Sequence, residues 1–311
     1  MIVTVTANTA IDQTVFVPSF KKNTTMRAAR SVLSMGGKAT DAAWILGELG
    51  LPSLSLGFAA GALGEKVKAL LEARGGLTDF IPVEGETRLN VVVIDTGDQT
   101  YSTISTSSLK VNDGHVNVLR TRYIEALPEA TCIILGGTLP VGMSPSFYTE
   151  MIRLARERNI PVIFDAAEPN LSAGLAAYPD FIKPNRDELG SAVGYPIESI
   201  EAAHRAGLSI LEKYGTSLII TLGDNGALAV LPDRTWRIPP LNVEVVSPAG
   251  AGDAVLAGLA ASIHRGQPIE DGLRLGMAAA AAVCLMPGTA DCRRSDVERL
   301  LAQVELIPYP S

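Results

Sequence analysis

A single aspartate in the stretch SPAGAGDAVLAG (247–258) stands where a glycine-rich loop leads into an apolar helix. Gly250 and Gly252 would let a ligand approach the backbone, and the N–H groups at a helix start attract anions. A bound anion would repel Asp253, unless this aspartate removes a proton from a group beside the anion. The stretch therefore predicts either a proton-abstracting aspartate within an anion site or an ordinary turn with a helix cap.

A second glycine pair lies in MGGKATDAA (35–43), again at an expected helix start. Gly36 and Gly37 would let a ligand hydroxyl approach the backbone, and Lys38 could hold a phosphate. A plain loop with a solvated lysine would contain the same residues. The alternatives stay open on this stretch alone.

Two stretches that follow expected strands carry oxygen ligands and glycines. In KPNRDEL (183–189), Asn185 and Glu188 are three residues apart and could hold a metal-bound water. The same spacing is typical of an N-terminal capping box. In TLGDNGAL (221–228), two glycines follow a strand, which alone indicates a turn.

Two familiar phosphate-binding motifs do not fit. A P-loop ending at Lys38 would need glycine at position 32 and Ser or Thr at 39, where the chain has Val32 and Ala39. A dinucleotide fingerprint starting at Gly250 would need a glycine where the chain has Val255. A phosphate site in this chain must therefore be built differently.

The composition of the 311 residues indicates a folded protein with a large core, because 47% are hydrophobic. A net charge of −7 argues against a nucleic-acid or acidic-membrane surface, so neither partner is expected. The N-terminus lacks the basic start of a signal peptide, and the apolar run 277–286 is too short to span a bilayer. Cys132, Cys284 and Cys292 form no CxxC pair and favour a reduced, cytoplasmic protein.

Short β-branched runs alternate with amphipathic helical stretches such as 145–160 and 200–215. This alternation predicts βαβ units and a mostly parallel sheet with helices on both faces, with strands at 2–7, 53–59, 132–137, 161–166, 181–185 and 217–223. Ligands of such sheets bind beyond the carboxyl ends of the strands. The residues expected there are 8–12, 136–140, 183–188 and 223–226.

One region departs from this alternation. Residues 87–105 predict a hairpin that turns at Gly97 and Asp98, and 12–20 and 26–34 could supply further strands. We expect a small β layer over one end of the main sheet, inserted from about 12–35 and 87–107. No linker divides the chain, so a single domain over 1–311 is expected.

The whole chain resembles the PfkB, or ribokinase-like, family of sugar kinases. Seven motifs occur in the family's order: NTAID (8–12), GGKATDAA (36–43), TRLN (87–90), GGTLPVGM (136–143), IKPNRDEL (182–189), TLGDNGAL (221–228) and AGAGDAVLAG (249–258). Four of them are similar to the branch that holds 1-phosphofructokinase, tagatose-6-phosphate kinase and the minor 6-phosphofructokinase. The resemblance implies an α/β, ribokinase-like three-layer sandwich with a mostly parallel central sheet and a small β lid.

The resemblance also implies ATP-dependent phosphoryl transfer to a hydroxyl of a sugar phosphate. Asp253 matches the catalytic base, and the N–H groups of Gly250, Ala251 and Gly252 would stabilise the transferring phosphoryl group. Asn185 and Glu188 would place Mg²⁺, largely through water. The nucleotide would lie against Lys183, Asn185, Thr221, Gly223 and Gly226.

For the acceptor, the resemblance implies a site made of Asp12, Gly36, Gly37, Lys38, Asp41, Arg88, Asn90 and Thr138. Lys38 and Arg88 would bind a phosphate already on the sugar. The lid would close over the sugar and exclude water, and it would form the contact of a homodimer.

Several positions depart from the family pattern. Asp41 replaces the usual asparagine, Ala39 replaces a glycine, Pro248 and Ala249 replace a threonine pair, and the second lid strand lacks its usual basic residue or Pro-Gly pair. These departures leave an unphosphorylated sugar, polyol or nucleoside open as the acceptor. A non-catalytic protein that binds a sugar or nucleotide is a further alternative, which the presence of Asp253 and its glycines disfavours.

Overall fold

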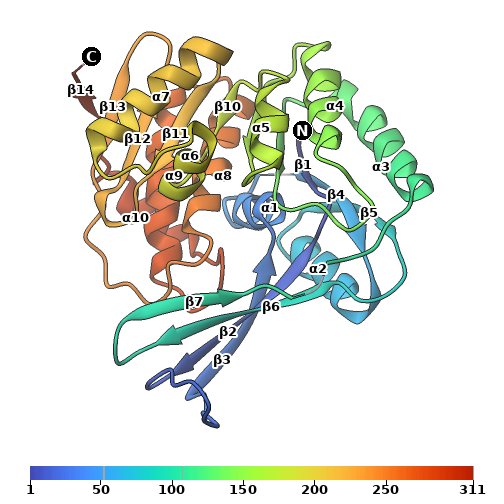
Figure 1. Cartoon of the computed structure of the whole chain (residues 1–311), viewed down its shortest axis with the longest axis vertical. Helices are drawn as coiled ribbons and strands as arrows, with labels where there is room; N and C mark the ends of the chain where they lie inside the picture. Colours follow the sequence, from blue (N-terminus) through green and yellow to red (C-terminus); the bar gives the residue numbers. More distant parts are fainter. Residues whose placement is uncertain (52, 107, 311) are drawn as a thin grey trace.

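The chain folds into a large sheet between two layers of helices, with a smaller sheet at one end (Figure 1). The computed structural model describes residues 1–51, 53–106 and 108–310. Within them the main sheet has the order β14-β13-β12-β11-β10-β9-β8-β1-β4-β5. These strands are β1 (Ile2–Thr6), β4 (Ser53–Ala59), β5 (Leu77–Pro82), β8 (Cys132–Gly136), β9 (Val162–Asp165), β10 (Phe181–Ile182), β11 (Ser217–Thr221), β12 (Ala227–Val230), β13 (Thr235–Ile238) and β14 (Ile307–Tyr309).

The strands from β5 to β11 run parallel, and β12, β13 and β14 extend the sheet antiparallel. A parallel strand covered on both faces buries every side chain, as Ile2 on one face and Val3 on the other illustrate. The six strands predicted from apolar runs are therefore confirmed. β5 and β12–β14 were not predicted.

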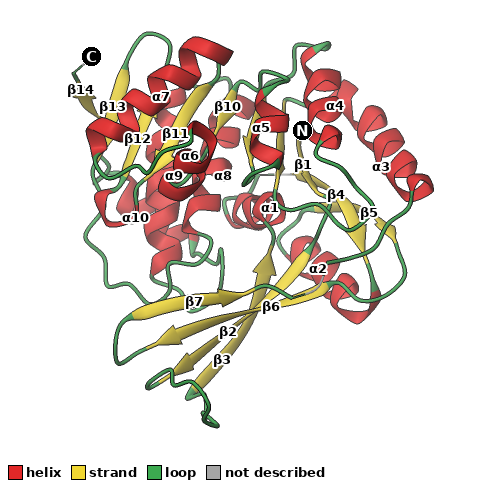
Figure 2. Cartoon of the chain, viewed as in Figure 1, coloured by secondary structure: helices red, strands yellow, loops and turns green. Residues whose placement is uncertain are grey.

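Helices cover the two faces in separate groups (Figure 2). One face packs against α1 (Lys38–Glu48), α8 (Ala251–Arg265), α9 (Ile269–Cys284) and α10 (Arg294–Leu301). The other packs against α3 (Asp113–Ala126), α4 (Ser146–Arg156), α5 (Asn170–Leu175), α6 (Arg186–Val193) and α7 (Ile200–Tyr214). The predicted three-layer α/β sandwich is confirmed.

The small sheet has the order β3-β2-β6-β7, with β2 (Ala10–Val17), β3 (Arg30–Gly36), β6 (Arg88–Asp95) and β7 (Thr100–Ile104). The predicted hairpin is confirmed, because β6 and β7 pair antiparallel across residues 96–99. Helix α2 (Gly61–Ala73) packs against its base through Val67 and Leu71, which join Ile11 and Met35 in one cluster. We call this sheet the lid.

The lid also touches the loop that precedes α8. Phe16, Val92 and Ile94 form an apolar cluster with Val246 and Ala249 of that loop. The expected lid segments, about 12–35 and 87–107, contain nearly all of the lid strands, although position 107 lies outside the described residues. The single domain over 1–311 stays a prediction, and position 311 is likewise outside the described residues.

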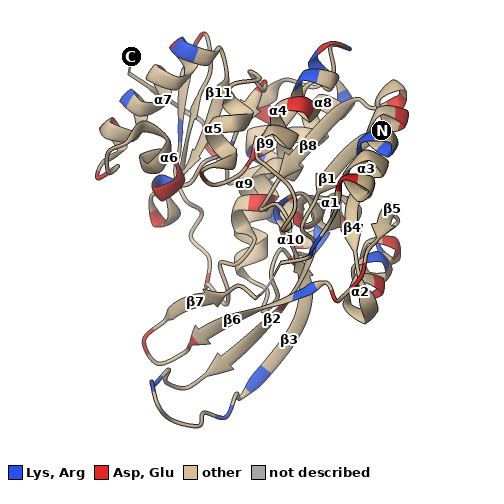
Figure 3. Ribbon diagram, turned by 45° about the vertical axis from the view of Figure 1, so that its right-hand side comes forward, with Lys and Arg blue, Asp and Glu red and all other residues tan. Residues whose placement is uncertain are grey.

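Charged residues of both signs are interspersed along the chain in the view of Figure 3. Among the described residues, none of the helices combines the length and the apolar character needed to cross a bilayer.

Candidate functional site

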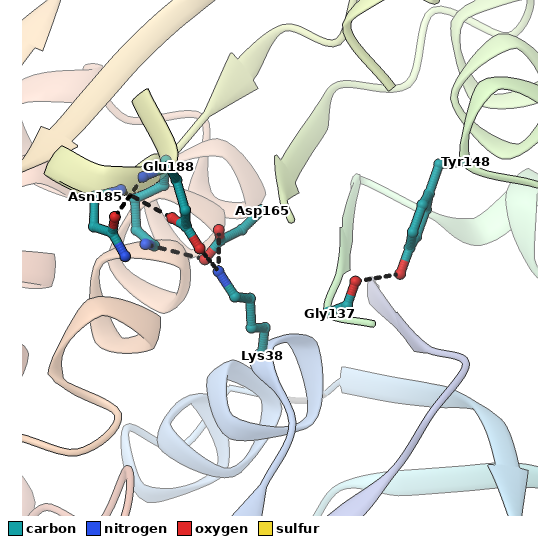
Figure 4. A network of polar contacts seen from close by, with 7 residues as sticks. Lys38, Gly137, Tyr148, Asp165, Asn185 and Glu188 are labelled. Carbon is teal, nitrogen blue, oxygen red and sulfur yellow. Dashed lines mark hydrogen bonds and ion pairs between the residues drawn. The ribbon is translucent and has the colours of Figure 1, made fainter. Parts of the chain in front are cut away.

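A cluster of charged side chains lies where the carboxyl ends of the central strands meet the start of α1 (Figure 4). Asp165 ends β9, Lys183 follows β10, and Lys38 is the first residue of α1. The bridge between Asn185 and Thr221 brings the residues after β10 against the end of β11. Parallel strands end at one edge of a sheet, so side chains far apart in the sequence converge there.

Asp165 holds two ammonium groups together. Lys38 Nζ lies 2.6 Å from Asp165 Oδ1, and Lys183 Nζ lies 3.0 Å from Asp165 Oδ2. The Asp165 side chain is 1% exposed. Burial favours its neutral form, but the two lysines outweigh burial and hold the pKa of Asp165 below its usual range. The buried aspartate is therefore a carboxylate that fixes both cations.

Glu188 links this cluster to the start of α6. Its Oε1 accepts from Lys38 Nζ at 2.8 Å, and its Oε2 accepts from the backbone N–H of Asn185 at 2.9 Å. The side chain of Asn185 accepts from the N–H of Glu188 at 2.8 Å, which completes a capping box. Both Asn185 and Glu188 therefore have a structural role, whatever else they bind.

The ammonium group of Lys38 is engaged by Asp165 and Glu188. Its expected role on a sugar phosphate, beside Arg88, stays a prediction. Burial alone would favour the neutral amine, and these carboxylates raise the pKa of Lys38 instead. Lys38 therefore belongs to the same cluster as Lys183.

The glycine-rich loop before α8 presents an unpaired N–H group to this cluster. The N–H groups of Ala251 and Asp253 donate to the carbonyls of Pro248 and Gly250, at 3.2 and 3.0 Å. Among the described residues, the N–H group of Gly252 has no hydrogen-bond acceptor. A Cβ added at Gly252 would lie 3.3 Å from Lys183 Nζ. An unused N–H group and an ammonium group thus lie close together at the helix start, which suits an anion.

Gly250 needs glycine for its backbone. It caps α8 with a φ of 81°, and a Cβ there would lie 2.3 Å from the backbone nitrogen of Ala290. Gly252 is not among the positive-φ residues. The conformational requirement of the loop therefore lies at Gly250, and an open approach to the backbone lies at Gly252.

Asp253 lies in the first turn of α8, beside the same charges. Burial raises its pKa to about 7, and the charge of Asp165 adds to this effect, while Lys183 and Lys38 oppose it. A carboxyl group poised near neutrality can accept a proton and release it again.

The lid contributes a second group of polar residues through the pairing of its strands. β2 and β6 pair in parallel with Asp12 opposite Asn90, so Asn90 Nδ2 donates to Asp12 Oδ1 at 2.9 Å. Asp12 is buried, which raises its pKa although Asn90, Thr289 and Arg88 act in the other direction. A Cβ at Gly36 would lie 2.3 Å from Asp12 Oδ1, so glycine leaves room for this carboxylate.

Arg88 and Asn8 lie next to this pair. Arg88 Nη2 donates to the carbonyl of Asn8 at 3.3 Å, and its Nε is buried with no hydrogen-bond partner among the described residues. Asn8 Nδ2 donates to Thr138 Oγ1 at 3.0 Å. Asp41, from α1, is buried beside Asp12, Arg88 and Asp253. The structure thus brings together five of the expected acceptor residues: Asp12, Asp41, Arg88, Asn90 and Thr138.

The turn after β11 has one structural glycine and one open glycine. Gly226 has a φ of 73°, and a Cβ there would lie 2.1 Å from the carbonyl of Ile238. Gly223 also has a positive φ, but a Cβ there would meet nothing within 4 Å. Thr221 is tied to the neighbouring loop, because its N–H donates to Pro184 at 3.0 Å.

Asp165 and Asn8 belong to the site, but the sequence analysis did not name them as site residues. Asp165 ends the run VIFD, where one acidic residue closes an otherwise apolar strand. An acidic residue at the carboxyl end of a buried strand is the signal that could have identified it. Asn8 lies within the NTAID motif, whose residues 8–12 were expected at the ligand-binding edge of the sheet. Of these residues only Asp12 was assigned a role.

Comparisons with known proteins show what this chain is similar to. The family model described as pfkB family carbohydrate kinase matches residues 2–296. A 1-phosphofructokinase of Haloferax volcanii is 33% identical over 302 residues, which cover 97% of this chain and 95% of that protein. A tagatose-6-phosphate kinase of Staphylococcus epidermidis is 26% identical and covers 99% of both chains. The solved structure of a possible 1-phosphofructokinase from Thermotoga maritima superposes with a TM-score of 0.89, at 26% identity and with 100% of both chains covered.

The two glycines of the loop should respond differently to alanine. Gly250→Ala should lower the free energy of unfolding by about 1–3 kcal/mol, because alanine is strained at positive φ and its Cβ would meet Ala290. Gly252→Ala is the matched control and should be destabilised less, since the position is helical and its Cβ would meet only the Lys183 side chain, at 3.3 Å. Denaturant unfolding of both variants measures this difference. Equal losses would contradict the assignment of the strained position to Gly250.

Proposed function

Since the chain belongs to the pfkB family of carbohydrate kinases, we propose that it transfers the γ-phosphoryl group of ATP to a hydroxyl of a sugar phosphate. The observation that carries this proposal is the arrangement at the start of α8. Asp253, with a pKa near neutrality, stands beside the unused N–H of Gly252 and the ammonium group of Lys183. Relatives named 1-phosphofructokinase and tagatose-6-phosphate kinase support a phosphorylated acceptor.

In the proposed reaction Asp253 accepts the proton of the acceptor hydroxyl. The hydroxyl oxygen forms a bond to the γ-phosphorus as the bond from that phosphorus to ADP breaks. The N–H of Gly252 and the ammonium group of Lys183 stabilise negative charge on the transferring group. Both groups act best where water is excluded. The lid strands β2 and β6 supply acceptor residues themselves, so the lid would help to exclude water from the acceptor.

The residues after β9 and β10 suit Mg²⁺ held through water. The oxygen atoms that could bind a metal ion directly are already engaged. Glu188 pairs with Lys38 and Asn185, and Asp165 pairs with both lysines. No cluster of three acidic, histidine or cysteine ligands occurs among the described residues. Carboxylate oxygens can accept further hydrogen bonds from metal-bound water, as suits an ion that dehydrates reluctantly. Mg²⁺ would supply charge neutralisation for the phosphates.

Arg88 is the cation that we assign to a phosphate on the acceptor. It is partly buried and its Nε has no partner, so a planar guanidinium face is available. Lys38 is engaged by Asp165 and Glu188, and its charge also acts on Asp253, so we assign Lys38 to the transferring group rather than to the acceptor's phosphate.

An unphosphorylated sugar or polyol is the second candidate acceptor, and one observation favours it. Three buried oxygens near the lid lack a hydrogen-bond partner among the described residues: Asn8 Oδ1, Asp41 Oδ1 and Asn90 Oδ1. Several unpaired acceptors suit a ligand rich in hydroxyl donors. Strand β7 adds no cation to the lid.

We also propose that two copies of the chain pair through the lid. All five residues of β7 are exposed, and this strand forms one edge of its sheet. Tyr101 and Ile104 are 57% and 54% exposed, which is high for large apolar side chains in a monomer. An uncovered edge of this kind favours association.

Replacing Asp253 should remove the base and its pH dependence. Asp253→Asn should lower kcat by roughly 10²–10⁴-fold, the usual range for a general base, and leave ATP affinity in place. For the unmodified protein, kcat/KM should rise about tenfold per pH unit up to about 7 and then level off, because only the ionised carboxylate accepts a proton. Initial rates across pH measure this, with the exposed Asp98→Asn as control. Near-native turnover in Asp253→Asn would remove it from this role.

Replacing Arg88 distinguishes the two acceptor classes. Charged hydrogen bonds to phosphate contribute roughly 1.5–3 kcal/mol, so Arg88→Ala should raise KM for the best phosphosugar by about 10- to 100-fold. KM for ATP should change little. The substrates to compare are fructose 1-phosphate, fructose 6-phosphate, tagatose 6-phosphate and their unphosphorylated forms, with the exposed Arg27→Ala as control. An unchanged phosphosugar KM would favour the unphosphorylated acceptor.

A charge on the exposed lid strand should separate the two copies. The chain has a mass of 32.7 kDa, and light scattering after gel filtration should give twice this value. Tyr101→Asp should shift the mass towards that of one chain, whereas Tyr195→Asp, at another exposed tyrosine, should not. A protein that is already a single chain before mutation would exclude the proposed dimer.

A further inference from the structure

Asp41 is a buried carboxyl group that the reaction described above does not use. It lies in the first turn of α1, its side chain is 3% exposed, and its Oδ1 has no hydrogen-bond partner among the described residues. An ionised carboxylate in such a place would carry a large desolvation cost. The surroundings must therefore either pair this group or keep it neutral.

The groups around Asp41 are mainly of its own sign. Asp253 faces it from α8 and Asp12 from β2, and Arg88 from β6 opposes their effect. Arg88 is shared, because it also acts on Asp12. The lysines of the cluster, Lys38 and Lys183, are held by Asp165. A single guanidinium group thus acts on both Asp41 and Asp12, and Asp253 adds a further carboxyl group beside Asp41.

The carboxyl groups of Asp41 and Asp253 lie within hydrogen-bonding reach of each other. Two ionised carboxylates have no hydrogen to share, and like charges at this distance cannot both persist, so one of the pair must hold a proton. Asp253 has Lys183 and Lys38 nearby to support its charge. Asp41 is more deeply buried than Asp253, with 3% of its side chain exposed, and its pKa is raised by burial first and then by Asp253 and Asp12.

We propose that Asp41 is a neutral carboxylic acid that donates a hydrogen bond to the Asp253 carboxylate and so orients this base towards the acceptor hydroxyl. Asp41 is a positioning residue, and the idea rests on the proposed function only where Asp253 is taken as the base. During transfer Asp253 accepts the proton of the acceptor hydroxyl, and Asp41 keeps its own. The carbonyl oxygen of Asp41 remains free to accept from a second acceptor hydroxyl.

This assignment also changes the electrostatics of the acceptor site. A charged Asp41 would repel a sugar phosphate. The replacement of asparagine by Asp41 was therefore one reason to keep an unphosphorylated acceptor open. A neutral Asp41 offers one donor and one acceptor, as an asparagine does, and adds no negative charge. The positive charge of Arg88 is then opposed by Asp12 alone on the lid side.

Infrared spectroscopy tests the proton directly and needs no substrate. At a pH roughly two units above the pKa of Asp253, we expect the carbonyl stretch of a protonated carboxyl group in the unmodified protein. The band should disappear in Asp41→Asn and persist in the exposed Asp98→Asn control. Absence of the band from the unmodified protein, or its persistence in Asp41→Asn, would overturn the proposal.

The pH dependence of kcat/KM separates a neutral donor from a charged neighbour. Asp41→Asn retains a donor and no charge, so the acidic limb should stay within about half a pH unit of its original position. An ionised Asp41 would instead raise the pKa of Asp253, and its removal would move the limb down by about 1–3 units. Asp41→Leu lacks the donor, so the limb should move up and kcat should fall about tenfold or more. A downward shift in either variant would overturn the proposal.

The kinetic assay uses ATP with whichever of fructose 1-phosphate, fructose 6-phosphate and tagatose 6-phosphate gives the highest kcat/KM. If none of these reacts, the proposed function fails, and the infrared band alone decides the state of Asp41. If Asp41→Leu does not fold, Asp41→Asn and the infrared band still decide. Failure of the proposed function and failure of the inference are therefore distinguishable.

Discussion

The site depends on one buried charge, the Asp165 carboxylate between two lysines. A carboxylate at the end of β9 is costly to bury, and Lys38 and Lys183 compensate it from two other parts of the chain. Through Lys38 the same interaction reaches Glu188, whose other oxygen caps α6. Removing Asp165 would leave two ammonium groups close together, with only Glu188 paired to one of them among the described residues. The carboxylate therefore fixes where the cations of the site stand relative to the start of α8.

The acceptor side is held by strand register and by one loop. Because β2 and β6 pair in parallel, Asp12 stands opposite Asn90, and Arg88 stands opposite Ala10 at the start of the same pair. The loop after α9 then ties the lid to the anion site. Thr289 donates to Ser34 of β3 at 2.8 Å, and Ala290 donates to the carbonyl of Ala249 at 3.0 Å. A movement of the lid would therefore also displace the glycine-rich loop.

The two sides carry different charge balances, which suits transfer between an anion and a neutral hydroxyl. Near Gly252, Lys183 supplies a positive charge, and Asp165 holds Lys38 in the same cluster, which would suit negative charge on a phosphoryl group. On the acceptor side, carboxyl groups outnumber the single Arg88, so hydroxyl donors are favoured there. Asp253 stands between the two regions, and its pKa near neutrality reflects both burial and this mixture of charges.

The sequence by itself determined the features that depend on neighbouring residues. Apolar runs identified the central strands, the turn at Gly97 and Asp98 identified the lid hairpin, and the glycines around Ala251 marked the helix start that presents Asp253. These are local patterns, because strand alternation, turn conformation and helix capping are set within a few residues. The family resemblance followed from the order of the same patterns, and the fold and the comparisons confirm it.

Only the tertiary structure decided which charges meet. Lys38 and Asp165 are 127 residues apart, and nothing in either neighbourhood shows that they pair. The pairing of Lys38 with Asp165 could therefore not be predicted from the sequence. The sequence identified Asp41 and Asp253 as candidate site residues in two separate motifs. Their carboxyl groups lie together in the interior because α1 packs against α8. Protonation depends on the distances and burial that packing creates, and sequence spacing does not contain either.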